Sequence, residues 1–276
     1  MTQHISLLQD LVSRPRKYLF DLSSCGAAWF AAGNSFFAYQ SGSLGGFHLG
    51  GVWAGLLQLV AAVFVFGGQV QATYRGGAYA VPFWRLGHVN LVSAIVMLTI
   101  PLFAADPALA GSALLPGVTL LLWATGEYQI GWVKDREESL AATDSAGRAD
   151  SAKMIAAGYR RSILLYGVAD FAAVVSTAIS IGTVLPAIGA GGAGVLFVVA
   201  MYRSLTGRDE EKSAAEAARI PFLLYAAGYC VQAAASIVEP LSVVCNLCWA
   251  KAYHSLTIVV DRESADKHAA RQHSRG

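Results

Sequence analysis

Four ionisable residues lie inside long apolar segments of the sequence: Glu127, Asp170, Lys251 and His254. A charge inside a membrane is costly, so such residues usually mark a proton relay, a ligand site or a counter-ion. From a rise of ~1.5 Å per residue, Lys251 lies about 18 Å into its segment, Glu127 about 22 Å and Asp170 about 21 Å. Acids and a base at one depth can pair if their helices face each other. We therefore expect a polar site at mid-membrane.

The positions of His254 and of three other ionisable residues suggest their roles. His254 follows Lys251 by three residues, on the same side of a helix, and is expected to be a polar neighbour of the lysine rather than a metal ligand. Glu239 lies at the outer end of the last apolar segment and is a further candidate for a proton relay. His48 and His88 lie at opposite ends of their segments, which suits interfacial positions.

The four cysteines, Cys25, Cys230, Cys245 and Cys248, all fall within apolar segments. Cys245 and Cys248 form a C-x-x-C pair, a spacing that occurs in zinc sites and redox motifs. Nothing in the sequence supplies the second half of a zinc site. We therefore expect these residues to act as small buried hydrophobes, and we expect no metal.

The composition is typical of a polytopic membrane protein. Of 276 residues, 55% are hydrophobic and 14% are charged, whereas about 25% are charged in a soluble domain. Eight apolar segments approach the ~20 residues that span the hydrocarbon core. They are 20–41, 47–69, 86–105, 112–133, 162–184, 188–205, 220–237 and 240–260. The predicted fold is all-α, a single integral membrane domain of about eight transmembrane helices.

The basic residues predict the orientation, because Lys and Arg are retained on the cytoplasmic side. Together with Arg203, five tails and loops contain 19 of the 20 Lys and Arg: 1–19, 70–85, 134–161, 206–219 and 261–276. The loops between them, on the opposite side, contain none. We therefore expect both termini in the cytoplasm and a multi-pass protein of the inner (plasma) membrane, with the lipid bilayer as partner. The net charge of +2 is a loop effect, so no nucleic-acid partner is expected, and a homo-oligomer stays open.

The chain divides into a cytoplasmic segment 1–19, an extra helix 20–41, a seven-helix core 47–260 and a cytoplasmic tail 261–276. The connector 134–161 mixes charges with Ala and is expected to be a loop with a helical turn or two. The segment 206–219 has acids before bases, as in a helix extension. The polar tail is expected to fray.

The segment "WAKAYHSLTIV" around Lys251 resembles the retinal-lysine helix of microbial rhodopsins. A desolvated amine is readily neutral, and a neutral amine forms a Schiff base with an aldehyde. Other stretches are similar to further helices of that family: "LVAAVFVF" (59–66), "WRLGHVNLVSAIVM" (84–97), "ILLYGVAD" (163–170), "FVVAMY" (197–202) and "ARIPFLLYAAGYC" (218–230). The family has seven spans, so this chain adds one helix before them.

The resemblance implies a light-responsive protein, either a photosensor or a light-driven ion transporter, with all-trans-retinal on Lys251. Tyr225, Tyr229, Trp249 and Trp123 would line the retinal pocket, and Glu127 or Asp170 would be the counter-ion. The chain departs from the family in the span at 112–133, which has no Arg and no acid at the level where the family's third helix has them. Leu247 stands where the family usually has Asp.

Other functions compete with the retinal hypothesis. "GVWAGLLQLVAAVFVFGG" followed by "FW" resembles acetate uptake transporters, which predicts a small-solute or monocarboxylate channel or transporter in which Lys251 binds an anion and His254 assists. Glu127 and Asp170 could instead act as an acid pair in a membrane enzyme, for example in terpene cyclisation, although no motif supports this. A structural subunit is the remaining alternative. We expect light response or transport, and no enzymatic activity.

Overall fold

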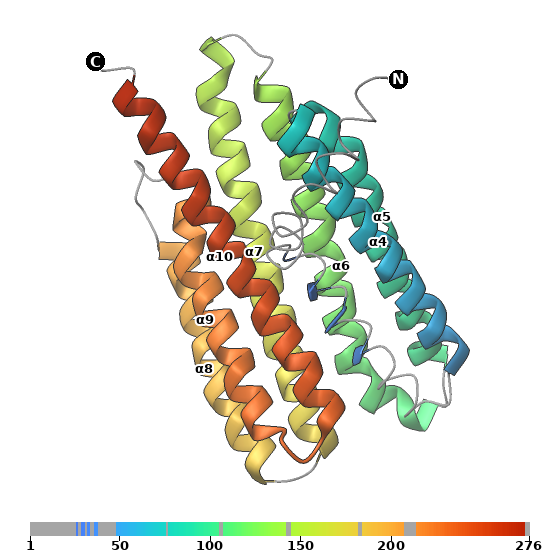
Figure 1. The fold of residues 1–276 in the computed structure, drawn as a ribbon. Helices are drawn as coiled ribbons and strands as arrows, with labels where there is room; N and C mark the ends of the chain where they lie inside the picture. The colour runs from blue at the N-terminus through green and yellow to red at the C-terminus, as the bar shows by residue number, and fades with distance from the viewer. Residues whose placement is uncertain are drawn as a thin grey trace, which may run out of the picture.

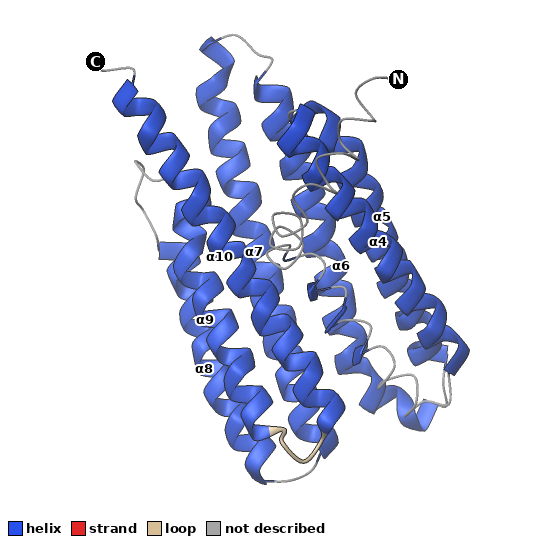
Figure 2. Ribbon diagram, in the orientation of Figure 1, coloured by secondary structure: helices blue, strands red, loops and turns tan. Residues whose placement is uncertain are grey.

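The computed structural model describes residues 26, 29, 30, 32, 33, 36 and 37 and the ranges 48–75, 77–104, 107–141, 145–181, 184–206 and 214–273. These residues form seven long helices and no strand (Figure 2). The helices are α4 (His48–Arg75), α5 (Gly77–Ala104), α6 (Pro107–Ala141), α7 (Ser145–Ile181), α8 (Val184–Thr206), α9 (Ala214–Ala235) and α10 (Pro240–His273). The all-α prediction is confirmed for this part of the chain.

Each helix packs against the next one in the sequence, and α7 also contacts α9. Figure 1 shows α4, α5 and α6 on one side of the bundle and α8, α9 and α10 on the other, with α7 joining them. Successive helices run in opposite directions, so the connections alternate between two ends. The junctions α4–α5, α6–α7 and α8–α9 and the end of α10 belong to one end. These are the basic segments of the sequence, which the fold therefore gathers together.

Three helices are longer than a membrane is thick. α6, α7 and α10 have 35, 37 and 34 residues, or ~50–55 Å at 1.5 Å per residue. The expected loop at 134–161 is helical up to Ala141 and again from Ser145, and the tail expected to fray is helical to His273. Both predictions were wrong because Ala, Lys, Arg and Glu favour helix, so a charged segment rich in these residues can continue a helix.

The predicted extra helix at 20–41 is described at seven residues between 26 and 37, all helical; we call them the N-terminal segment. It lies between α10 and the α6–α7 pair. The Cys245 thiol of α10 donates to the Gly33 carbonyl over 3.3 Å. The ring of Phe30 lies 4.8 Å from that of Tyr253 and 6.1 Å from that of Tyr166. In its described part the segment is thus a component of the core.

The bundle has large apolar side chains on its outer surface, and its largely apolar core also contains several polar side chains. Trp53, Leu59 and Val63 are largely exposed on α4, as are Ile188 and Val195 on α8. The interior contains carboxyl and amide groups, which soluble proteins place mostly on the surface. Within the described residues, two helices are long and apolar enough to cross a membrane, Ala80–Thr99 and Val184–Thr206. Exposed apolar faces of this extent require lipid or a partner to cover them.

Close packing of α8 on α9 depends on glycine. A Cβ atom at Gly228 would lie 2.3 Å from Cε1 of Phe197, a fully buried ring that packs between Tyr225 and Tyr229. We expect Gly228→Ala to lower the free energy of unfolding by about 1–3 kcal/mol, because the ring has no space to move. Thermal unfolding in detergent measures this change.

The matched control is Gly191→Ala on α8, where nothing lies within 4 Å of the added Cβ. This variant should unfold at or slightly above the wild-type temperature, since alanine favours helix over glycine by roughly 1 kcal/mol. Equal stability of the two variants would contradict the packing argument.

Candidate functional site

The centre of the bundle contains one carboxylate surrounded by aromatic hydrogen-bond donors. Asp170 of α7 is 0% exposed. Its Oδ1 atom accepts hydrogen bonds from Trp123 Nε1 of α6 over 3.0 Å and from the Tyr229 hydroxyl of α9 over 2.5 Å. Its Oδ2 atom accepts from the Tyr253 hydroxyl of α10 over 2.6 Å. Four helices thus converge on one side chain, and we call these four residues the Asp170 cage.

Rings close the cage against water. Trp249 stacks edge-on against Trp123 at 4.9 Å and lies 5.1 Å from Tyr229. Tyr225 lies 5.0 Å from Tyr253, but its hydroxyl donates to the Ile163 carbonyl and not to Asp170. The cage therefore has three donors and no basic group. Hydrogen bonds to a charged group contribute about 1.5–3 kcal/mol each, which offsets part of the cost of burying the carboxylate.

A second buried carboxylate lies one helical turn away. The Tyr166 hydroxyl of α7 donates to Glu127 Oε1 of α6. The other oxygen, Oε2, lies 3.2 Å from Nε2 of His88 on α5. We call Glu127, Tyr166 and His88 the Glu127 cluster.

The helix geometry connects the two sites. Trp123 and Glu127 are four residues apart on α6, as are Tyr166 and Asp170 on α7, so each pair lies on one face of its helix. Because α6 and α7 run in opposite directions, Trp123 meets Asp170 and Glu127 meets Tyr166. Each helix supplies one acid and one aromatic donor, and the two acids are offset by one turn, ~6 Å along the axis.

The partners of His88 define where its proton is. Nδ1 lies 2.6 Å from the Trp84 carbonyl, which can only accept, so Nδ1 bears a hydrogen. Nε2 faces Glu127, and one proton must lie between imidazole and carboxylate for them to bind. Sequence placed His88 at an interface, whereas the fold makes it the second partner of Glu127. The side chain of His48 lies outside the described residues.

Lys251 lies away from both acids. It is half-buried, and at 100° per residue it lies roughly 200° around α10 from Tyr253, which faces Asp170. Its neighbours on that side, Leu247 and His254, are exposed. Among the described residues the Lys251 ammonium forms no hydrogen bond or ion pair. The structure thus forms no ion pair between Lys251 and either of the two acids predicted as its counter-ion.

The remaining predicted residues are also apart from the cage. Glu239 is exposed in the turn between α9 and α10. Cys245 and Cys248 are buried free thiols, as expected, but Cys230 is exposed, and Cys25 lies outside the described residues. In the described ranges no three His, Cys, Asp or Glu side chains are close enough to hold a metal ion.

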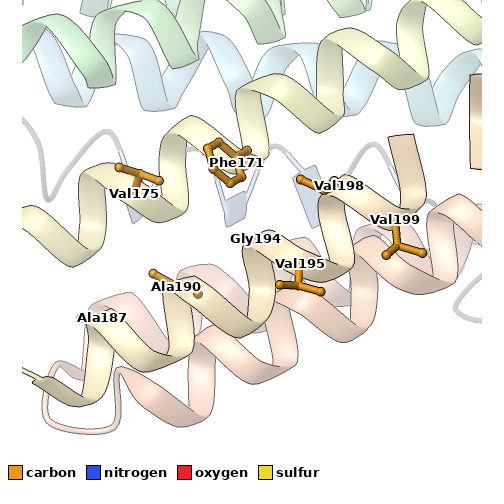
Figure 3. A pocket seen from close by; sticks show the side chains of 9 residues that line it. Phe171, Val175, Ala187, Ala190, Gly194, Val195, Val198 and Val199 are labelled. Carbon is orange, nitrogen blue, oxygen red and sulfur yellow. The ribbon is translucent and has the colours of Figure 1, made fainter. Parts of the chain in front are cut away.

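An apolar groove lies between α7 and α8 (Figure 3). It has a volume of about 570 Å³, and its lining includes Phe171 and Val175 of α7 and Ala190, Gly194 and Val198 of α8. Phe171 follows Asp170 in the sequence, roughly 100° further around α7, and is partly exposed, whereas Asp170 is fully buried. All lining residues are apolar, so the groove has no group for acid-base or ion chemistry.

The sequence pointed to both acids, Glu127 and Asp170, and to two further cage residues, Trp123 and Tyr229. It did not identify Tyr166, Tyr253 and His88 as partners of the acids. The available signal was the i, i+4 spacing of Tyr166 from Asp170.

No protein-family model, curated protein or solved structure matches the chain.

Proposed function

We propose that the chain is a multi-pass protein of the inner membrane, with eight spans and both termini in the cytoplasm. Four observations support this. The seven described helices coincide with seven predicted spans, successive helices are antiparallel, and the basic segments share one end of the bundle. The outward faces of α4, α8 and α10 are apolar, as contact with lipid requires.

Within this bundle we propose proton transport, with Asp170 as the group that binds and releases the proton. The observation that supports it is the buried carboxylate with three hydrogen-bond donors and no cation. Ionisable groups inside a membrane commonly form proton relays. The three donors stabilise the charged form of Asp170. If one of these hydrogen bonds is lost, the neutral form of Asp170 is favoured, so the cage can accommodate either form. Coupling to a small solute would make the protein a proton-coupled transporter.

The Glu127 cluster provides the cytoplasmic half of the relay. His88 lies three residues from Arg85, whose guanidinium forms an exposed ion pair with Asp135 over 2.7 Å at the basic end of the bundle. A proton taken up by the imidazole passes to Glu127, which shares it with His88. From there it must cross one helical turn past Tyr166 to reach Asp170.

Proteoliposomes loaded with the pH dye pyranine test the proposal. After an acid jump outside, wild-type protein should acidify the interior faster than protein-free liposomes, and valinomycin with potassium should increase the rate by removing the opposing voltage. Rates equal to those of protein-free liposomes, for protein shown to be folded, would refute proton transport.

We expect Glu127→Gln to lower the proton flux about ten-fold, because a charged hydrogen bond of roughly 1.5–3 kcal/mol is lost from the relay. The same dye assay measures it. The control is Asp135→Asn, which removes the exposed ion pair with Arg85 and should leave the flux within about two-fold, as surface ion pairs contribute little. Equal flux in the two variants would remove Glu127 from the relay.

The retinal protein is the second candidate, and the aromatic cluster of Trp123, Tyr229 and Trp249 around a buried acid favours it. The position of Lys251 on the other side of α10 argues against it, so transport without a chromophore ranks first. Expression with all-trans-retinal decides between them. A retinal protein gains a visible or near-ultraviolet band that hydroxylamine bleaches and that Lys251→Ala abolishes.

A further inference from the structure

Two buried polar side chains near the Asp170 cage have no partner among the described residues. Gln232 of α9 is 1% exposed, and neither its Oε1 nor its Nε2 atom has a hydrogen-bond partner. Ser236, in the turn that follows α9, is 0% exposed, and its Oγ is also without one. Burying an amide or hydroxyl without a hydrogen bond costs about 1–3 kcal/mol on protein scales. Groups of this kind normally bind ordered water or a ligand.

Both side chains continue the face of α9 that begins at Tyr229. Residues 229, 232 and 236 are three and four positions apart, which places them on one side of a helix. Gln232 and Ser236 lie ~4.5 Å and ~10 Å beyond Tyr229 along the axis, toward the α9–α10 turn. This direction leads away from the Glu127 cluster and toward the opposite end of the bundle.

α10 supplies a third polar group at the same level. Asn246 is seven residues before Tyr253, hence on the same face of α10, and is 4% exposed. Its side-chain amide forms no hydrogen bond within the described part of the chain. Because α9 and α10 are antiparallel and packed together, Asn246 lies on the turn side of Tyr253, as Gln232 does of Tyr229.

We propose that Gln232, Ser236 and Asn246 line a hydrated path from the Asp170 cage to the α9–α10 turn, and that its ligand is a short chain of water molecules. A primary amide offers two donors and one acceptor oxygen, and a buried water typically makes about three hydrogen bonds, so two amides and a hydroxyl are suitable partners. The role of this path as the outer half of a proton route rests on the proposed function. The hydration of the path is inferred from the unpartnered polar groups and is independent of that function.

Water access is measured by cysteine modification. In a chain whose four native cysteines are replaced by alanine or serine, single cysteines are introduced as Ser236→Cys, Gln232→Cys or Asn246→Cys. Ala54→Cys on α4 and Ala94→Cys on α5 are the controls, since both positions are fully buried and neither lies on α9 or α10. Each protein in liposomes is treated with aminoethyl methanethiosulfonate, and unreacted thiols are then counted with a fluorescent maleimide after denaturation.

We expect the Ser236→Cys and Gln232→Cys thiols to react at least about ten-fold faster than the two controls, because only a hydrated thiol ionises to the reactive thiolate. Ser236→Cys changes one atom, so it should fold even if the larger changes do not. Equal rates at all positions, whether slow or fast, would refute the path: slow rates mean a dry core, and fast rates mean a loose bundle.

A second measurement separates this inference from the proposed function. Gln232→Leu should lower the proton flux about ten-fold, because the proton loses one hydrogen-bonded step of its route. A ten-fold change corresponds to roughly 1.4 kcal/mol. Thiols that react selectively in a protein without proton flux would support the path and refute transport. Flux without selective modification would support transport and refute the path.

Discussion

Asp170→Asn is expected to reduce the proton flux by about two orders of magnitude, the contribution typical of a positioned proton-transfer group. Asparagine has the shape of aspartate, and its carbonyl oxygen can still accept from Trp123 and Tyr229. It cannot take up a proton in the relevant pH range, so the relay ends there. Pyranine-loaded proteoliposomes measure the flux at several imposed pH gradients.

Folding must be separated from function in this experiment. In the Asp170→Asn variant the new amide nitrogen would face the Tyr253 hydroxyl, which can reverse its role and accept. The variant should therefore elute as a folded protein in detergent, with an unfolding temperature near that of wild type. Asp170→Glu provides the rescue, since it restores an ionisable group and should recover part of the flux. Wild-type flux in Asp170→Asn would show that the cage is only structural.

The helices could be predicted from the sequence because apolar length and basic ends are both local signals. Seven of the eight predicted spans coincide with α4 to α10. The extensions of α6, α7 and α10 into charged sequence could not, because the charged, Ala-containing segment 145–161 has the composition of a loop. Its helical state depends on propensity and on continuity with the apolar part of α7.

The acids of the site could be predicted, but their partners could not. Glu127 and Asp170 are conspicuous because they interrupt apolar sequence. The depth of a side chain along its helix follows from counting residues. The side of the helix on which it lies cannot be read from the sequence when the helix is apolar on all sides. Lys251 shares its depth with Asp170 but lies on another side of α10, and Tyr253, two residues later, faces the acid.

Tyr253→Phe and Tyr225→Phe form a matched pair that separates a functional hydroxyl from a structural one. Both tyrosines are fully buried in the same core, 5.0 Å apart. The Tyr253 hydroxyl donates to the Asp170 carboxylate, and the Tyr225 hydroxyl donates to the Ile163 carbonyl. Each change deletes one oxygen and leaves the ring in place, so packing is preserved.

We expect both variants to remain folded but to lose different amounts of flux. Tyr253→Phe removes a hydrogen bond to a carboxylate, which contributes about 1.5–3 kcal/mol to the free energy of unfolding. Tyr225→Phe removes a hydrogen bond to a carbonyl inside α7, which contributes about 0.5–1.5 kcal/mol. Only Tyr253→Phe changes the balance between the charged and neutral forms of Asp170, and it should alter the flux about ten-fold, the equivalent of roughly 1.4 kcal/mol. Unfolding and dye assays on the same preparations measure both quantities. Tyr225→Phe controls for the loss of a buried tyrosine hydroxyl from the same core, so a larger change of flux in Tyr253→Phe is assigned to the hydrogen bond with the carboxylate. Equal flux in the two variants would show that Asp170 does not exchange its proton through the cage.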